Sequence, residues 1–237
     1  VNFANDYSDG IRGTDADRVG PQRLVGSGAA TPGQVKAVAF ACFGLAAVAG
    51  LALVVLTQAW WLLAVGAACI LAAWYYTGGA RPYGYAGLGE VFVFVFFGLV
   101  AVCGTVFVQA GRVGADAVWT GVWVGALACA ILVANNLRDL AGDRSVGKLT
   151  LATRLGDGGT RRFYVGLAAL AVAGVGVVAW LTSPWALLAW VMVPLLARPV
   201  RTMLAGGTGR ELIGVLKATG IAEAVAAVGL LVGLWVA

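Results

Sequence analysis

The stretch AVWTGVWVGALACAILVANNLRDLAGD, residues 117–143, decides the fold of this protein. Residues 117–137 hold no charged side chain, and an α-helix needs roughly 20 such residues to cross the hydrocarbon core of a bilayer. Asn135, Asp139 and Asp143 then follow at intervals of four positions, where the apolar stretch ends. That spacing places all three on one face of a helix. The sequence therefore predicts a transmembrane helix that ends in a row of oxygen-bearing side chains.

The rest of the chain repeats this apolar character. Six further candidate spans run over residues of about 35–57, 60–77, 89–110, 163–182, 184–200 and 213–236. Of the 237 residues, 61% are hydrophobic and 11% are charged, whereas soluble domains carry about 25% charged residues. This composition excludes an ordinary soluble enzyme. It predicts an all-α, polytopic transmembrane bundle of seven full spans plus an N-terminal helical stub, forming one domain over residues 1–237.

The charged residues predict how the chain is oriented. Of the 16 Lys and Arg residues, all but Arg112 fall in alternate loops, and such loops are cytoplasmic. We therefore expect a multi-pass protein of the plasma membrane, and the net charge of +5 indicates no nucleic-acid partner. The polar loops 10–34 and 138–162 share the cytoplasmic side, so they can meet over one end of the bundle. The absence of histidine excludes His-based metal sites and catalytic triads.

A second acidic motif opens the chain. In NDYSDGIRGTD, residues 5–15, Asn5 and Asp9 repeat the four-residue spacing, and Asp15 lies beyond Gly10 and Gly13, where we expect the helix to break. Carboxylate and amide oxygens suit Mg²⁺, which binds through a few carboxylates together with substrate phosphates. Basic residues flank both motifs and suit a phosphate. The alternative interpretation is that these charges are solvated and only orient the protein.

These motifs resemble those of the UbiA superfamily of intramembrane prenyltransferases, especially its 1,4-dihydroxy-2-naphthoate polyprenyltransferase branch in menaquinone biosynthesis. The resemblance is carried by NDYSDGIRGTDADRVGPQRLVGSG at 5–28, YYTGGARPYGYAGLGEVFVFVFFG at 75–98 and NNLRDLAGDRSVGKLTLATRLG at 135–156. It extends over essentially the whole chain and implies a nine-helix fold, here without the first helix and most of the second. It implies transfer of a polyprenyl group from polyprenyl diphosphate to 1,4-dihydroxy-2-naphthoate, with loss of CO₂ and diphosphate, to give demethylmenaquinone.

The resemblance also implies roles for individual residues. Mg²⁺ ligands would be Asn5, Asp9, Asp15, Asn135, Asp139 and Asp143. The catalytic group would comprise Asp9, Asp15, Asp139, Asp143 and Lys148, and the diphosphate would bind Arg23, Arg138, Lys148 and Arg154. In the first motif Gly13 replaces the superfamily's last Asp and Asp15 follows, a departure that the naphthoate branch shares. The family also has a tyrosine–lysine pair in its third cytoplasmic loop, where Arg81 is our candidate for the cation.

Three further acids are weaker candidates. Asp6 is a possible outer-shell partner of the metal. Glu90 starts a span, where it could orient the acceptor or a phosphate-binding Arg. Glu223 lies within the last span, where an acid is a functional candidate by default, although pairing with Lys217 is an equal alternative.

Two other functions stay open from the sequence. One is a UbiA-type prenyltransferase with another acceptor, such as homogentisate or a different aromatic compound. The other is a divalent-cation transporter, which the placement of the acids at helix ends rather than through the membrane disfavours. The sequence assigns neither a prenyl chain length nor an oligomeric state.

Overall fold

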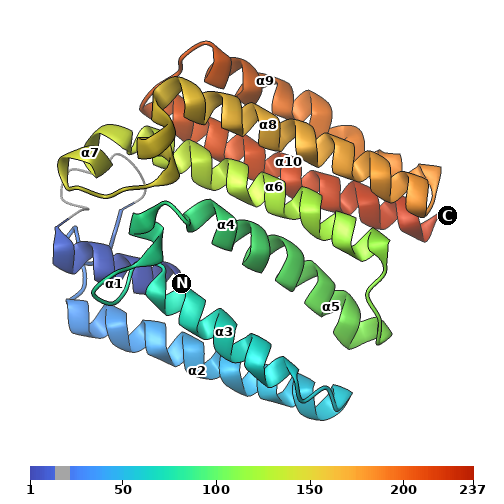
Figure 1. Cartoon of the computed structure of the whole chain (residues 1–237), viewed down its shortest axis with the longest axis horizontal. Coiled ribbons are helices and arrows are strands. Elements are labelled where there is room, and N and C mark those ends of the chain that lie inside the picture. Colours follow the sequence, from blue (N-terminus) through green and yellow to red (C-terminus); the bar gives the residue numbers. More distant parts are fainter. Residues whose placement is uncertain (14–21) are drawn as a thin grey trace. The chain divides into compact units, whose positions relative to one another are not determined.

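A computed structural model describes residues 1–13 and 22–237 of the chain (Figure 1). The described residues form helices joined by short connections, and no strand occurs among them. The prediction of an all-α fold is confirmed. The chain divides into two compact units, the first made of Val1–Gly89 with Gly142–Thr150 and the second of Glu90–Ala141 with Leu151–Ala237.

The first unit contains the N-terminal helices. Its elements are α1 (Asn2–Arg12), α2 (Pro32–Thr57), α3 (Leu62–Tyr75), the 3₁₀ helix η1 (Tyr83–Ala86) and most of the short α7 (Leu140–Ser145). Helix α2 packs against both α1 and α3. Helix α1 ends at Gly13, whose φ of 73° is left-handed and favours glycine. The helix break that the sequence predicts after Gly10 and Gly13 therefore occurs at the second glycine.

The second unit is built around α6 (Ala115–Arg138). Its other elements are α4 (Gly89–Val93), the π-helix η2 (Phe94–Val100), α5 (Ala101–Ala110), α8 (Leu151–Leu181), η3 (Pro184–Val191), α9 (Met192–Leu204) and α10 (Arg210–Trp235). Helix α6 lies beside α8, η2 and α10, while α10 also contacts α9 and η3 (Figure 1). The side chains of Trp123 and Leu127 on α6 are fully buried in this core.

The described helices agree with the predicted spans. Six of them are long and apolar enough to cross a membrane: Pro32–Thr57, Gly89–Ala110, Ala115–Arg138, Leu151–Leu181, Pro184–Leu204 and Arg210–Trp235. The predicted span 60–77 corresponds to the shorter apolar helix Leu62–Tyr75. Large apolar side chains such as Leu56, Trp180 and Trp235 are at least 80% exposed on these helices, which suits lipid rather than water as their surroundings. The chain is a multi-pass membrane protein.

Small residues bring η2 and α6 together. A Cβ atom added to Gly98 would lie 2.5 Å from the carbonyl oxygen of Gly121 and 2.6 Å from Cα of Gly125. Only glycine permits this backbone approach, as is common where membrane helices pack. The crossing fixes the register of the segment that begins at Glu90 against the end of α6.

One prediction about the second motif is wrong. Helix α6 ends at Arg138, Asp139 is its C-cap with φ −90° and ψ 3°, and α7 begins at Leu140. Asn135, Asp139 and Asp143 therefore do not line one continuous helix. Short polar side chains and glycine have low helix propensity because they favour other backbone conformations, and the run from Asn135 to Asp143 is rich in both.

Candidate active site

The first motif faces the connection between α3 and η1. Oδ1 of Asn5 accepts a hydrogen bond from Oγ1 of Thr77 at 2.9 Å. One turn further along α1, Oδ1 of Asp9 accepts a hydrogen bond from the hydroxyl of Tyr85 at 2.7 Å. Both Thr77 and Asp9 are buried. The four-residue spacing thus presents Asn5 and Asp9 to the same neighbouring segment of the first unit.

Tyr85 also joins the first motif to part of the second. Nζ of Lys148 lies 5.0 Å from the centroid of the Tyr85 ring, within the range of a cation–π interaction. The backbone N–H of Leu149 donates to the carbonyl oxygen of Tyr85 at 3.2 Å, and Lys148 forms an ion pair with Asp143 at 3.4 Å. Lys148 and Leu149 of the second polar loop therefore pack against Tyr85, the residue whose hydroxyl binds Asp9 of the first motif.

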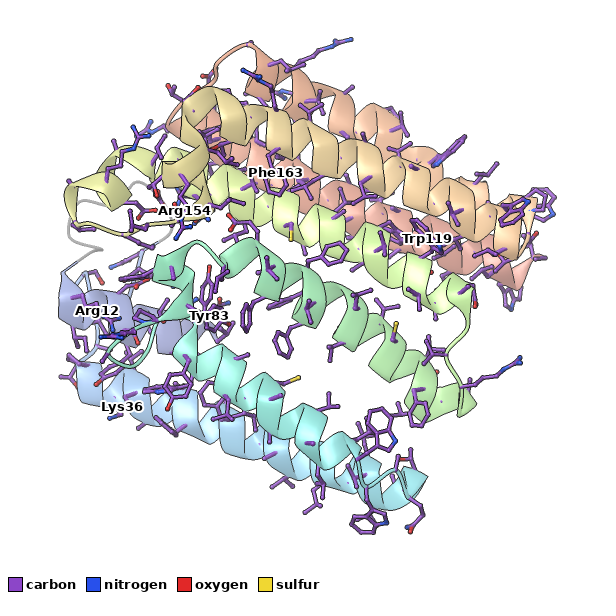
Figure 2. The ribbon with its side chains drawn as sticks, in the orientation of Figure 1. Arg12, Lys36, Tyr83, Trp119, Arg154 and Phe163 are labelled. Carbon is purple, nitrogen blue, oxygen red and sulfur yellow. The ribbon has the colours of Figure 1, made fainter. Side chains whose placement is uncertain are left out.

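A second cation lies on the same tyrosine ring. The guanidinium carbon of Arg12 is 5.3 Å from the ring centroid of Tyr85. Arg12 also donates hydrogen bonds to the carbonyl oxygens of Thr77 and Gly79, and Figure 2 labels its position on α1. The cations beside this tyrosine are thus Arg12 and Lys148, whereas Arg81 is exposed.

The neighbouring tyrosine has a different environment. The hydroxyl of Tyr83 donates to the carbonyl oxygen of Ala72 at 2.7 Å. Burial raises the pKa of Tyr83 to about 12. The hydroxyl therefore stays protonated at neutral pH and continues to hold η1 against the end of α3.

Asp6 contacts the backbone of the segment that follows α1. Its carboxylate accepts hydrogen bonds from the backbone N–H groups of Leu24 at 2.9 Å and Val25 at 3.0 Å, and its side chain is buried. A Cβ atom on Gly10 would lie 2.5 Å from Cβ of Val25, so glycine is required there for the segment to approach α1. Asp6 thereby anchors the backbone next to the half-buried Arg23.

The part of the second motif in the second unit is organised by Arg138. Its Nε and Nη2 atoms each lie 2.7 Å from one carboxylate oxygen of Asp139, and Nη2 also donates to Oδ1 of Asn135 at 2.8 Å. The Arg138 side chain is 2% exposed and that of Asp139 is 21% exposed. The guanidinium therefore contacts the same oxygens that the sequence assigns to a metal.

The remaining candidates occupy separate positions. Arg154 is exposed near the start of α8, at the opposite end of the second unit from Trp119 (Figure 2). Glu90 is buried, and its Oε1 accepts a hydrogen bond from Nδ2 of Asn136 at 3.0 Å. Glu223 is half-buried on α10. Asp15 lies outside the described residues.

The sequence also places the chain among known proteins. Residues 1–207 match the model of the UbiA prenyltransferase family. The chain belongs to this family. It is similar to proteins named 1,4-dihydroxy-2-naphthoate octaprenyltransferase in three organisms. The Mycobacterium tuberculosis protein is 56% identical, over 94% of this chain and 75% of that protein. The Mycobacterium leprae protein is 50% identical, over 96% of this chain and 77% of that protein. The Escherichia coli protein is 37% identical, over 86% of this chain and 68% of that protein. No solved structure matches the chain significantly.

The side chains of this UbiA prenyltransferase have the donor chemistry for Mg²⁺. Each unit carries oxygen donors of the kind that Mg²⁺ prefers, namely Asn5, Asp9 and Asp143 in the first unit and Asn135 and Asp139 in the second. Among residues 1–13 and 22–237, no three acidic or cysteine side chains gather as a metal-binding group. Magnesium therefore fits these side chains by ligand type.

Two residues that contact the candidate groups of this UbiA prenyltransferase do not stand out in the sequence, Tyr85 in the first unit and Asn136 in the second. Tyr85 is one of two tyrosines in the run RPYGYAG, and no pattern in the sequence distinguishes it from Tyr83. Asn136 was overlooked because Asn135 alone fits the four-residue spacing of the motif. The adjacency of two asparagines at the end of an apolar helix was the available signal, since a buried amide needs a hydrogen-bonding partner.

Proposed function

We propose that this protein transfers a polyprenyl group from polyprenyl diphosphate to 1,4-dihydroxy-2-naphthoate and so forms the reduced, hydroquinone form of demethylmenaquinone, which is oxidised to the quinone in a separate step. The observation that supports this most is the 56% identity, over 94% of the chain, to a mycobacterial protein named for this activity. The same name recurs for a relative at 37% identity. The polyprenyl diphosphate, the naphthoate and the lipid bilayer are thus the proposed partners.

The reaction sets clear demands on the site. The allylic C–O bond to the diphosphate breaks, and both of its electrons leave with the diphosphate. The ring carbon that bears the carboxylate attacks the allylic carbocation, and the electrons of the bond to CO₂ then restore the aromatic ring. Protons balance without a net transfer. The protein must stabilise the departing negative charge, exclude water from the carbocation and orient the ring.

Basic side chains near the motifs are proposed to hold the diphosphate. Lys148 is an ammonium donor beside Asp143 and Tyr85, and Arg138 brings a guanidinium to the second motif. Guanidinium groups bind phosphate oxygens in pairs, while lysine acts as a point charge. Arg23 and Arg154 are proposed to add further donors, and preorganised cations of this kind stabilise a leaving anion.

The acidic motifs are proposed to hold Mg²⁺. Its ligands would come from Asn5, Asp9, Asp15, Asn135, Asp139 and Asp143. When bound, the metal supplies positive charge that neutralises the leaving diphosphate. Tyr85 orients Asp9 through its hydroxyl and faces Lys148 through its ring, so it holds an acid and a base of the site in fixed positions.

The membrane serves the same chemistry. We propose that apolar helices such as Ala115–Arg138 keep water away from the carbocation and so protect it from hydrolysis. We further propose that the protein lies in the plasma membrane with its basic loops in the cytoplasm, so that the diphosphate headgroup and the naphthoate reach the site from that side.

Membranes from cells that express the protein provide the test. We expect a demethylmenaquinol, identified by mass as such or as its quinone after oxidation in air, when 1,4-dihydroxy-2-naphthoate, a polyprenyl diphosphate and Mg²⁺ are supplied. We expect its loss when EDTA is added. Asp9→Asn and Asp139→Asn should reduce turnover by about 10²-fold or more, whereas Asp116→Asn, at the exposed start of α6, should not. Prenylation of homogentisate alone, or cation uptake without any prenyl product, would contradict the proposal.

A further inference from the structure

Glu90 is a buried acid at the start of a membrane span. Its side chain is 4% exposed in the first turn of α4. Oε1 accepts a hydrogen bond from Nδ2 of Asn136, itself buried on α6, at 3.0 Å. Asn136 immediately follows Asn135 of the second motif. The carboxylate therefore sits beside the motif, held by the same helix.

The second carboxylate oxygen is left without a hydrogen bond. Within the described part of the chain, Oε2 of Glu90 is buried and has no partner. Burying an unsatisfied carboxylate oxygen costs stability, and such groups in native proteins call for an explanation. An oxygen in this position can accept a hydrogen bond from a bound molecule.

A second polar contact joins the Glu90 segment to α6. Sγ of Cys129 donates to the backbone carbonyl oxygen of Glu90 at 3.0 Å. Polar groups from α4 and α6 thus share one region of an apolar helical core, which is expected of a functional site in a membrane protein.

Helix packing alone does not account for Glu90. The contact between η2 and α6 is made by Gly98 against Gly121 and Gly125. It needs no carboxylate. The π-helical turn of η2 begins at Phe94, directly after α4, and such turns are frequent at functional sites.

We propose that Oε2 of Glu90 accepts a hydrogen bond from a phenolic hydroxyl of the aromatic acceptor, while Asn136 fixes the carboxylate through Oε1. The inference rests on the proposed function, because it names the acceptor's binding residue. A hydrogen bond from the hydroxyl to a carboxylate increases electron density in the ring that attacks the carbocation. The net reaction releases no proton from the ring. Glu90 therefore only accepts a hydrogen bond, and the hydroxyl of the aromatic substrate keeps its proton.

This role predicts a specific kind of selectivity. A site with a buried polar group rejects an analogue that lacks the matching hydroxyl, because the group is then left unpaired. The test uses 1,4-dihydroxy-2-naphthoate and its two monohydroxy analogues, 1-hydroxy-2-naphthoate and 4-hydroxy-2-naphthoate. Their binding to the purified protein in detergent is measured by calorimetry, and the KM values of both substrates are measured in parallel.

For the wild-type protein we expect one of the two analogues to bind about 10- to 100-fold more weakly than the dihydroxy compound, as loss of a hydrogen bond to a charged group predicts. Glu90→Gln keeps an oxygen for Asn136 and replaces the second oxygen with a donor. In this variant the affinities for that analogue and for the dihydroxy compound should differ by no more than about threefold. The hydroxyl and residue 90 would then be uncoupled, as a double-mutant cycle defines it. The KM for polyprenyl diphosphate should not change, and Asp116→Asn should behave as wild type.

Several outcomes separate this inference from the proposed function. An analogue penalty that is the same in wild type and Glu90→Gln, or a rise in the KM of both substrates alike, would overturn the role of Glu90. If Glu90→Gln does not fold, Glu90→Asp retracts the carboxylate by one methylene and should remove the same discrimination. Acceptor binding without turnover in the wild type would refute the proposed function and leave Glu90 testable by calorimetry. Neither binding nor turnover would refute both.

Discussion

The hydroxyl of Tyr85 lies 2.7 Å from Oδ1 of Asp9, although 76 positions separate the two residues in the chain. The ring of the same tyrosine faces the ammonium group of Lys148, 5.0 Å from its centroid. One side chain therefore fixes an acid from the first motif and a base from the second. These are the two kinds of group that the proposed complex of Mg²⁺ and polyprenyl diphosphate would require.

Replacing Tyr85 by Phe should impair catalysis more than folding. The variant keeps the ring beside Lys148 but loses the hydrogen bond to Asp9, and a bond to a charged group contributes about 1.5–3 kcal/mol. We expect kcat/KM for polyprenyl diphosphate to fall by about 10- to 100-fold. Prenyl transfer by the purified protein, together with its melting temperature, measures the two effects separately.

Tyr83→Phe is the matched control for that prediction. The hydroxyl of Tyr83 donates to a backbone carbonyl oxygen in the first unit, that of Ala72. Its loss should lower stability by about 1 kcal/mol and leave kcat/KM unchanged. Equal losses of activity in the two variants would show that η1 matters as a whole and that the Tyr85–Asp9 contact has no special role.

Arg138→Gln should change metal and diphosphate binding in opposite directions. The guanidinium contacts both oxygens of Asp139 and the amide oxygen of Asn135, so it competes with any cation for these atoms. Without it we expect Mn²⁺, used as a spectroscopic substitute for Mg²⁺, to bind more tightly in the absence of substrate. The KM for polyprenyl diphosphate should rise by about tenfold, since a charge-assisted contact is lost. Electron paramagnetic resonance measures the affinity for Mn²⁺. Unchanged or weaker Mn²⁺ binding would contradict the prediction.

Asp6→Ala should loosen the segment that follows α1. Two half-buried backbone N–H groups, those of Leu24 and Val25, would lose their acceptors, at a cost of about 1 kcal/mol each. Hydrogen exchange at these two amides should accelerate by at least about tenfold. Asp6→Asn, which retains one acceptor oxygen, should give an intermediate rate. Unchanged exchange in Asp6→Ala would mean that other contacts hold the segment.

Arg161→Met should destabilise the second unit without affecting the chemistry. Arg161 is 7% exposed, donates to the carbonyl oxygens of Met203 and Gly207 at 3.0 Å each, and pairs with Asp157 at 2.7 Å. Removing it leaves these acceptors without their donor, so we expect a loss of about 2–4 kcal/mol, measured as a lower melting temperature in detergent.

The neighbouring residue supplies the control for Arg161. Arg162 is exposed on the same turn of α8. Arg162→Met should change the free energy of unfolding by no more than about 0.5 kcal/mol and so leave the melting temperature almost unchanged. Activity per folded molecule should equal that of wild type in both variants. A selective loss of activity in Arg161→Met would instead place this residue in the substrate site.

Some features of the site follow from spacing and others do not. Asn5 and Asp9 share a helix face, as their four-residue spacing predicts, because α1 continues through both residues. The same spacing misled for Asp143, because the chain leaves the helix at Asp139. Spacing along a sequence predicts a shared face only while the backbone stays helical, and a run rich in Asn, Asp and Gly ends helices.

The sequence by itself determined the all-helical membrane fold, the positions of the spans and the two acidic motifs. These depend on local properties, namely the length of apolar stretches and the residues at their ends, and such properties can be determined from short segments of the sequence. Only the tertiary structure decided that Tyr85 contacts Asp9 and that Asp6 binds the backbone at Leu24 and Val25. It also decided that Asn136 donates to one carboxylate oxygen of Glu90, while the other has no hydrogen bond within the described part of the chain. Those contacts join residues far apart in the chain, and their partners are selected by how the helices pack, which no local pattern records.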